Sequence, residues 1–148
     1  MGFANSTASR YILDEETTMF ANTQLMGMDI GFPDVCLTPM PAPVPIPYPN
    51  IALGPMGVPA AYNVLFMCTP VHNMATTIPL TNGDNTGVLL GVVSHLMMGP
   101  ARHVTAAFTV IGSFAPVTRM TSVATHNMMN CPGLRLVPSQ VKVLVLAP

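Results

Sequence analysis

The side chains of this sequence best suited to metal chemistry are its cysteines and histidines. Structural zinc sites use four thiolate and imidazole ligands in a tetrahedron, and these ligands can come from distant parts of a chain. His103 lies within a predicted strand and is a reserve ligand, whereas Cys68 and His95 are interpreted as structural. The preferred ligands lie in turn-rich segments, where loops can meet: Cys36, His72, His126 and Cys131.

Each of these side chains has an ordinary alternative role. A lone buried cysteine behaves as a small hydrophobic residue, and a histidine is often a hydrogen-bonded surface residue. The sequence contains no compact CxxC or HExxH motif. Spacing alone therefore gives a weak metal signal.

Catalysis is not predicted. A cysteine nucleophile needs electropositive surroundings and an orienting partner, and nothing in the sequence supplies them. Beyond residue 16 the acidic residues are Asp29, Asp34 and Asp84, so a paired-carboxylate site is not expected. A thiol hydrolase that uses Cys131 remains the alternative, and its activity would be lost in Cys131→Ala.

The stretch that most restricts the fold is residues 39–49, where proline occupies every second position. Proline fixes φ, lacks an amide donor and disfavours helix in the residue before it, so the segment must be extended. Alternate amides of a strand point to the same side, so these prolines predict an edge strand that can pair on one side only. The alternative is a polyproline II linker, whose period is three.

The remaining pattern indicates an all-β fold in one unit. Sixteen prolines, eleven glycines and no tryptophan are typical of short extended segments and turns. A polar N-terminal segment, residues 1–24, is predicted to be flexible or partly helical over 12–20, and residues 25–148 to form the β domain. Short strands are predicted over 64–68, 78–80, 87–94, 103–111, 114–119, 134–137 and 140–146.

Composition excludes several classes of partner. Charged residues make up only 7% of the chain, and no Lys or Arg occurs between residues 11 and 101, so nucleic acid is not an expected partner. Apolar runs are far shorter than the ~20 residues of a membrane span, and the N-terminus is not a signal peptide. Three widely spaced cysteines fit a reducing, cytoplasmic origin. The thirteen methionines have no explanation in the pattern.

The run PDVCLTP followed by PVPIPYPN resembles the opening signature of the PAAR-like proteins, which tip the spike of bacterial type VI secretion systems. The resemblance extends from about residue 19 to the end. Residues 116–119, PVTR, stand where the family has proline-alanine-alanine-arginine, and 120–122 depart from its usual continuation. Residues 126–146 resemble its ligand-bearing loop and closing repeat, which makes His126 and Cys131 the firmest ligand pair.

The resemblance implies a small conical β-solenoid of stacked hairpins with a zinc near its apex. It further implies that the broad base docks on a VgrG-type trimeric spike protein and that the cone sharpens the spike for envelope puncture. A separately encoded toxin effector or chaperone is a further expected partner, and secretion by the apparatus would need no signal peptide. The alternative is a cytoplasmic adaptor that docks a toxin or chaperone without being fired.

Overall fold

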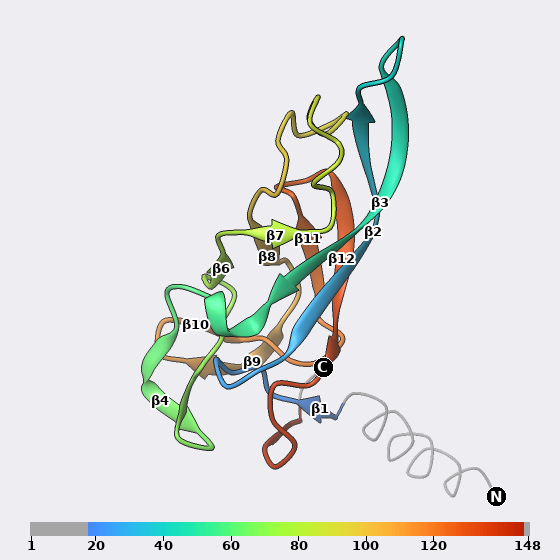
Figure 1. Ribbon diagram of the computed structural model, residues 1–148. Helices are drawn as coiled ribbons and strands as arrows, with labels where there is room; N and C mark the ends of the chain where they lie inside the picture. Colours follow the sequence, from blue (N-terminus) through green and yellow to red (C-terminus); the bar gives the residue numbers. More distant parts are fainter. Residues whose placement is uncertain (1–17, 147–148) are drawn as a thin grey trace, which may run out of the picture.

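In the computed structural model, which describes residues 18–146, the chain forms a tapered body of antiparallel β-strands (Figure 1). Its described part contains no α-helix, only a 3₁₀ turn, η1 (Gly54–Met56). The strands are β1 (Met19–Phe20), β2 (Met28–Thr38), β3 (Val44–Leu53), β4 (Ala61–Phe66), β5 (Thr69–Val71), β6 (Thr77–Ile78), β7 (Thr81–Asn82), β8 (Ala101–His103), β9 (Ala107–Gly112), β10 (Ala115–Val117), β11 (Val123–His126), β12 (Cys131–Val137) and β13 (Leu144–Val145). The predicted all-β class is confirmed.

Seven strands form one twisted, nearly closed sheet in the order β6-β8-β11-β12-β2-β3-β7. The β2–β3 hairpin is its longest pair and projects beyond the rest of the sheet as the narrow end of the body (Figure 1). Three two-stranded units, β4–β5, β9–β10 and β1–β13, lie together at the broad end. The last of these joins the two ends of the described chain.

Residues 44–49 of the proline-rich stretch lie in strand β3, as predicted, whereas residues 39–43 form the loop that joins β2 to β3 and not part of a strand. Pro45 and Pro47 lie opposite Leu37 and Val35 of β2, and both prolines are exposed. Strand β7 pairs only with Ile51 and the residue after it, so the proline-containing part of β3 has a sheet neighbour on one side. Because proline has no amide hydrogen to offer, the free side of β3 cannot extend the sheet by regular pairing.

The three units at the broad end are joined by backbone hydrogen bonds that close rings. The amide of Asn22 donates to the carbonyl of Thr118 (2.9 Å), that of Thr118 to His72 (3.1 Å), and that of His72 back to Asn22 (2.9 Å). A second ring closes through the same three segments in the opposite direction and uses two residues of each: Gln24 donates to Pro70, Met74 to Pro116, and Met120 to Phe20. The broad end therefore has approximate three-fold symmetry within one chain.

The strands alternate between the two faces, but with the usual polarity reversed. Cys131, Gly133 and Arg135 of β12 face inward, whereas Leu134 and Leu136, at alternate positions, are partly exposed. Strand β2 likewise turns acidic, glycine and cysteine residues inward. These residues have odd numbers up to 31 and even numbers from 34, and an irregularity in the pairing between 31 and 34 lets both sets face the interior. The apolar core that remains is made of small residues such as alanine and valine.

One sequence prediction fails in this fold. Residues 87–94 form turns with largely exposed side chains, not a buried strand. Their backbone bonds to the side of β2, with the amide of Leu37 donating to Leu90 (2.9 Å) and that of Val92 to Val35 (3.0 Å). The predicted N-terminal helix falls mostly on residues 1–17, outside the described part, and its last residues form β1.

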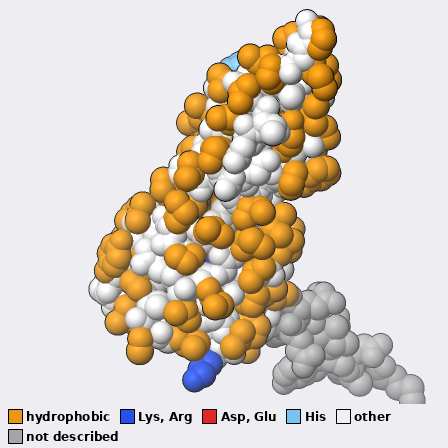
Figure 2. Space-filling model, viewed as in Figure 1, with side chains coloured by type: hydrophobic (Ala, Val, Ile, Leu, Met, Phe, Trp, Pro, Cys, Tyr) orange, Lys and Arg blue, Asp and Glu red, His pale blue; other side chains and the backbone are white. Residues whose placement is uncertain are grey.

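Hydrophobic side chains cover much of the surface. Figure 2 shows them over the whole viewed face, from the narrow end to the broad end, with almost no charge between them. The three acidic residues of the described chain are all buried. Residues 18–146 contain no helix long and apolar enough to cross a membrane.

Candidate metal-binding core

The interior of the tapered body is filled by polar side chains. A narrow body leaves little room for large apolar residues, and buried polar groups must then bond to one another. Nitrogen atoms of three buried histidines, His72, His103 and His126, nevertheless lack a hydrogen-bond partner among the described residues. Unpartnered, buried imidazole nitrogens are the kind of atom that metal sites use.

His126 and Cys131 lie directly opposite each other in the β11–β12 pair, so their side chains share the inner face. Both are buried, and both pack on Gly31 of the neighbouring strand β2. A Cβ placed on Gly31 would lie 2.9 Å from Cys131 Sγ and 3.1 Å from His126 Nδ1. The pair that the sequence favoured as ligands is therefore brought together, with a thiol and an unpartnered imidazole on one glycine.

Gly133 provides the other wall of the His126 pocket, because a Cβ there would lie 2.5 Å from His126 Cδ2 and closer still to Nε2. We expect Gly133→Ala to lower the free energy of unfolding by about 3 kcal/mol, since the buried ring has nowhere to move. Leu136→Ala, on the exposed face of the same strand, should cost less than about 1 kcal/mol. Urea denaturation followed by circular dichroism measures both, and equal losses would contradict the prediction.

His103 belongs to a buried ionic group with Asp29 and Arg135. The Arg135 guanidinium donates to Asp29 through Nε and, at 3.5 Å, through Nη2. His103 Nε2 lies 3.4 Å from Asp29 Oδ2 without hydrogen-bond geometry. Burial lowers the pKa of His103 to about 4 despite the Asp29 carboxylate, so the imidazole is neutral at pH 7.

His72 lies nearer the broad end, at the first hydrogen-bonded ring. Its imidazole packs on Gly57, where a Cβ would lie 2.8 Å from Nε2, and neither ring nitrogen has a partner in the described structure. Burial is the main cause that lowers the pKa of His72 to about 3, and it also lowers that of His126. All three buried histidines are therefore held in the neutral form that metals require.

Cys36 belongs to a different group. Its Sγ lies 3.6 Å from Asp34 Oδ1 and 3.7 Å from Asp84 Oδ2, and all three residues are buried. The ligand atoms of these three residues all lie within 4.8 Å of one another, so the group could hold a metal ion. In residues 18–146 it is the one set of three histidine, cysteine or acidic residues that meets this criterion.

The four predicted ligands are thus distributed over the core and not gathered within coordination distance of a single point. His126 and Cys131 adjoin, Cys36 faces two carboxylates, and His72 lies at the ring of the broad end. The proposed zinc ligation stays a prediction. Cys68 and His95, interpreted from the sequence as structural, are exposed.

Burial also defines the state of the thiols. It raises the pKa of Cys36 and Cys131 to about 12, and the carboxylates of Asp34 and Asp84 add to the shift. In the absence of a metal both thiols are therefore protonated at pH 7. A protonated, buried thiol is a poor nucleophile.

Sequence reasoning missed the partners of Cys36 and the internal repeat. The sequence does not show that Asp34 and Asp84 are neighbours, because nothing in the chain marks residues 50 positions apart as close in space. The repeat had a readable signal: residues 60–71 and 106–117 read AAYNVLFMCTPV and AAFTVIGSFAPV. These segments form two of the three units at the broad end.

Comparison with known families agrees with the geometry. The family described as the Toxin PAAR-like domain matches residues 27–133, which is most of the chain. No curated protein and no solved structure matched. The matched range includes β2–β3, two of the three units of the broad end, and the candidate ligands Asp34, Cys36, Asp84, His126 and Cys131. The chain belongs to the Toxin PAAR-like domain family.

Proposed function

We propose that this protein is the tip of a bacterial type VI secretion spike, with its broad end seated on a VgrG-type trimeric spike protein. The observation that carries the proposal is the three-fold closure of the broad end by two rings of backbone hydrogen bonds. A single chain with three equivalent units can make the same contact with each subunit of a trimer. The family membership and the taper of the body support the same role.

The three units present matching apolar side chains. Leu65, Ile111 and Leu144 occupy equivalent positions, because they pair with Pro70, Pro116 and Phe20 respectively. Three residues earlier in the chain lies a second triad, Tyr62 in β4, Phe108 in β9 and Val141 before β13, whose members are 59% to 63% exposed. Apolar and aromatic side chains of this size are the usual anchors of a protein interface.

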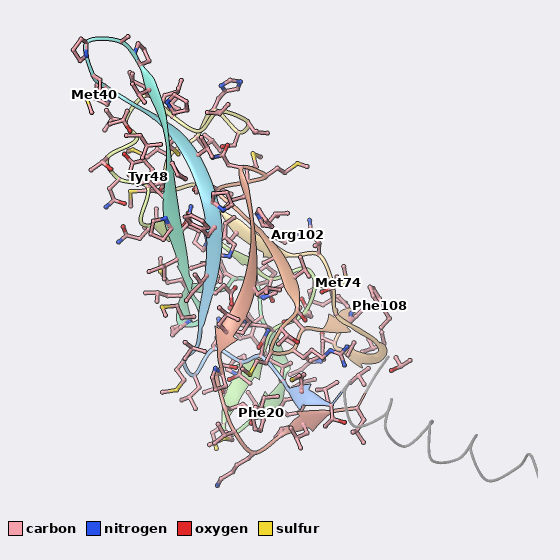
Figure 3. All side chains as sticks on the ribbon, turned by 90° about the vertical axis from the view of Figure 1, so that its right-hand side faces the viewer. Phe20, Met40, Tyr48, Met74, Arg102 and Phe108 are labelled. Carbon is pink, nitrogen blue, oxygen red and sulfur yellow. The ribbon has the colours of Figure 1, made fainter. Side chains whose placement is uncertain are left out.

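We expect Phe108→Asp to weaken binding to the trimeric spike protein at least tenfold, because a charge would be placed where an aromatic anchor is buried. Met40→Asp is the matched control, since Met40 is equally exposed but lies at the narrow end (Figure 3). Biolayer interferometry measures the affinities, and light scattering should give one 15.7 kDa chain per trimer.

Equal weakening by both variants, or no binding by the native chain, would remove the proposal. Capture of a toxin or chaperone without the spike protein would instead support the cytoplasmic adaptor. In the proposed role the protein waits in the bacterial cytoplasm, leaves with the spike without a signal peptide and carries a separately encoded toxin effector. It is not an enzyme in this proposal, because its buried thiols are protonated.

Zinc is part of the proposal. His126 and Cys131 fit it by donor type, since an unpartnered imidazole and a buried thiol are gathered on one glycine. His72 and the reserve ligand His103 are the other buried imidazoles with an unpartnered nitrogen. Zinc would cross-link strands and stiffen a body whose apolar core is small, which suits a tip that must pierce an envelope.

A further inference from the structure

The group formed by Asp34, Cys36 and Asp84 has an unbalanced charge. Both carboxylates are completely buried, and the two ion pairs formed within the described chain both use Asp29. No Lys, Arg or His nitrogen of the described residues lies within 4.0 Å of the Asp34 or Asp84 carboxylate. Two buried carboxylates side by side without a counter-charge are costly even when they accept hydrogen bonds, and a positive charge would offset this cost.

Two oxygen atoms at this group have no donor. Asp84 Oδ1 and Asn50 Oδ1 are buried and unpartnered in the described structure. Asn50 lies at the group, because its amide nitrogen donates to Asp34 Oδ2. Acceptors that face no donor, beside two carboxylates and a thiol, are the arrangement that a cation would complete.

The other polar neighbours act as a supporting shell. Asn127 Nδ2 donates to Asp84 Oδ2 (3.1 Å), and Asn130 Nδ2 donates to Asp34 Oδ1. Their oxygens are already used: that of Asn127 accepts from the amide of Gly99, and that of Asn130 from the amides of 93 and 94. Both amides are thus fixed with their donors toward the carboxylates, as in the outer shell of known metal sites.

We propose that Asp34, Cys36 and Asp84 bind a divalent transition cation of the zinc class, with Asn50 Oδ1 available as the fourth donor. One thiolate with carboxylate and amide oxygens suits a borderline-soft ion, whereas Ca²⁺ and Mg²⁺ take oxygen ligands alone. This site is separate from the pair His126 and Cys131, and it removes Cys36 from the predicted zinc ligands. It does not depend on which partner the broad end binds.

The position of the site gives it a mechanical role. Asp34 and Cys36 belong to β2 near the root of the projecting hairpin, Asn50 belongs to β3, and Asp84 lies in the loop after β7. A Cβ on Gly87 would strike the Cβ of Cys36, so this loop is held tightly against the hairpin. An ion here would join three segments where the narrow end leaves the sheet.

The test uses the full-length chain carrying Cys68→Ser and Cys131→Ser, in which Cys36 is the one remaining thiol. After removal of metal with a chelator, Co²⁺ is titrated and the thiolate-to-cobalt charge-transfer absorption is recorded. We expect this band to saturate at one equivalent and to be abolished by Zn²⁺. In this double-cysteine variant, the further substitution Asp84→Asn should weaken Co²⁺ binding at least tenfold, whereas His126→Gln should leave it unchanged.

Absence of the band in a folded chain, or a band that Asp84→Asn does not alter, would overturn the proposal. If the cysteine variants do not fold, elemental analysis compares the native chain with Asp84→Asn after growth in zinc. One metal equivalent fewer in the variant supports the site, and equal content overturns it. Neither measurement involves the trimeric spike protein, so failure here is distinguishable from failure of the proposed function.

Discussion

Replacing Asp29 with asparagine is expected to lower the free energy of unfolding by about 3–5 kcal/mol, because it leaves the Arg135 guanidinium buried without its counter-charge. Arg135 is the largest completely buried side chain among the described residues, and its Nε and Nη2 both donate to Asp29. No other described acidic side chain lies within 4.0 Å of the guanidinium. Chemical denaturation followed by circular dichroism measures the loss.

A double-mutant cycle separates the charge pair from general damage to the core. Arg135→Met alone should also be strongly destabilising, because it strands Asp29, whereas the combination with Asp29→Asn should cost clearly less than the sum of the two. Lys142→Ala removes an exposed charge and should change stability by no more than about 0.5 kcal/mol. Additive losses in the cycle would show that the two side chains are not a coupled pair.

Acid should destabilise the metal-free protein steeply below pH 6.5. His72 and His103 have pKa values lowered by burial to about 3 and about 4 in the folded chain, while the unfolded chain protonates them near pH 6.5. Between these values only the unfolded state binds the protons, so stability is full above pH 6.5 and falls by about 1.4 kcal/mol per pH unit for each histidine. From pH 6.5 to 4.5 the two together remove about 5 kcal/mol.

Denaturation curves in the presence of a chelator, recorded at half-unit steps of pH, measure this slope. His72→Gln should flatten the slope by the contribution of one proton, whereas His95→Gln should leave it unchanged because His95 is exposed. Constant stability between pH 6.5 and 5 would mean that the folded interior admits protonated imidazole. Bound metal should oppose the acid effect, because it competes with the same protons for neutral imidazole.

Three regions follow one another along the molecule: the three-fold broad end, the buried Asp29–Arg135 pair, and the group of Asp34, Cys36 and Asp84. The broad end presents three equivalent hydrophobic units, and the polar core behind it holds the strands in register. The thiol and carboxylate group lies further along, at the root of the projecting hairpin. In the proposed role, the exposed apolar side chains are covered by a partner protein.

Local chemistry in the sequence was enough to predict several features. Alternating proline at 39–49 predicted an extended segment with donors on one side, because proline has neither a free φ nor an amide hydrogen. Residues 44–49 of β3 have that form, and residues 39–43 form the hairpin loop. The abundance of proline and glycine predicted short strands and turns. The resemblance to the PAAR-like family, and not local chemistry, predicted His126 and Cys131 as a pair, and the β11–β12 hairpin places them directly opposite each other.

Only the tertiary structure decided which distant groups meet. The third unit of the broad end joins β1 to β13, so its symmetry is invisible until the two ends of the chain pair. Asp29 and Arg135 become partners, and Cys36 acquires Asp84, because neighbouring strands and the loop after β7 bring those positions into one narrow interior. The segment 87–94 has the composition of a buried strand, yet it forms turns that exchange only a few backbone hydrogen bonds with β2, and most of its side chains remain exposed. The amino-acid sequence determines which donors, acceptors and charges each side chain carries. Closure of the sheet determines which of these groups come close enough to bond.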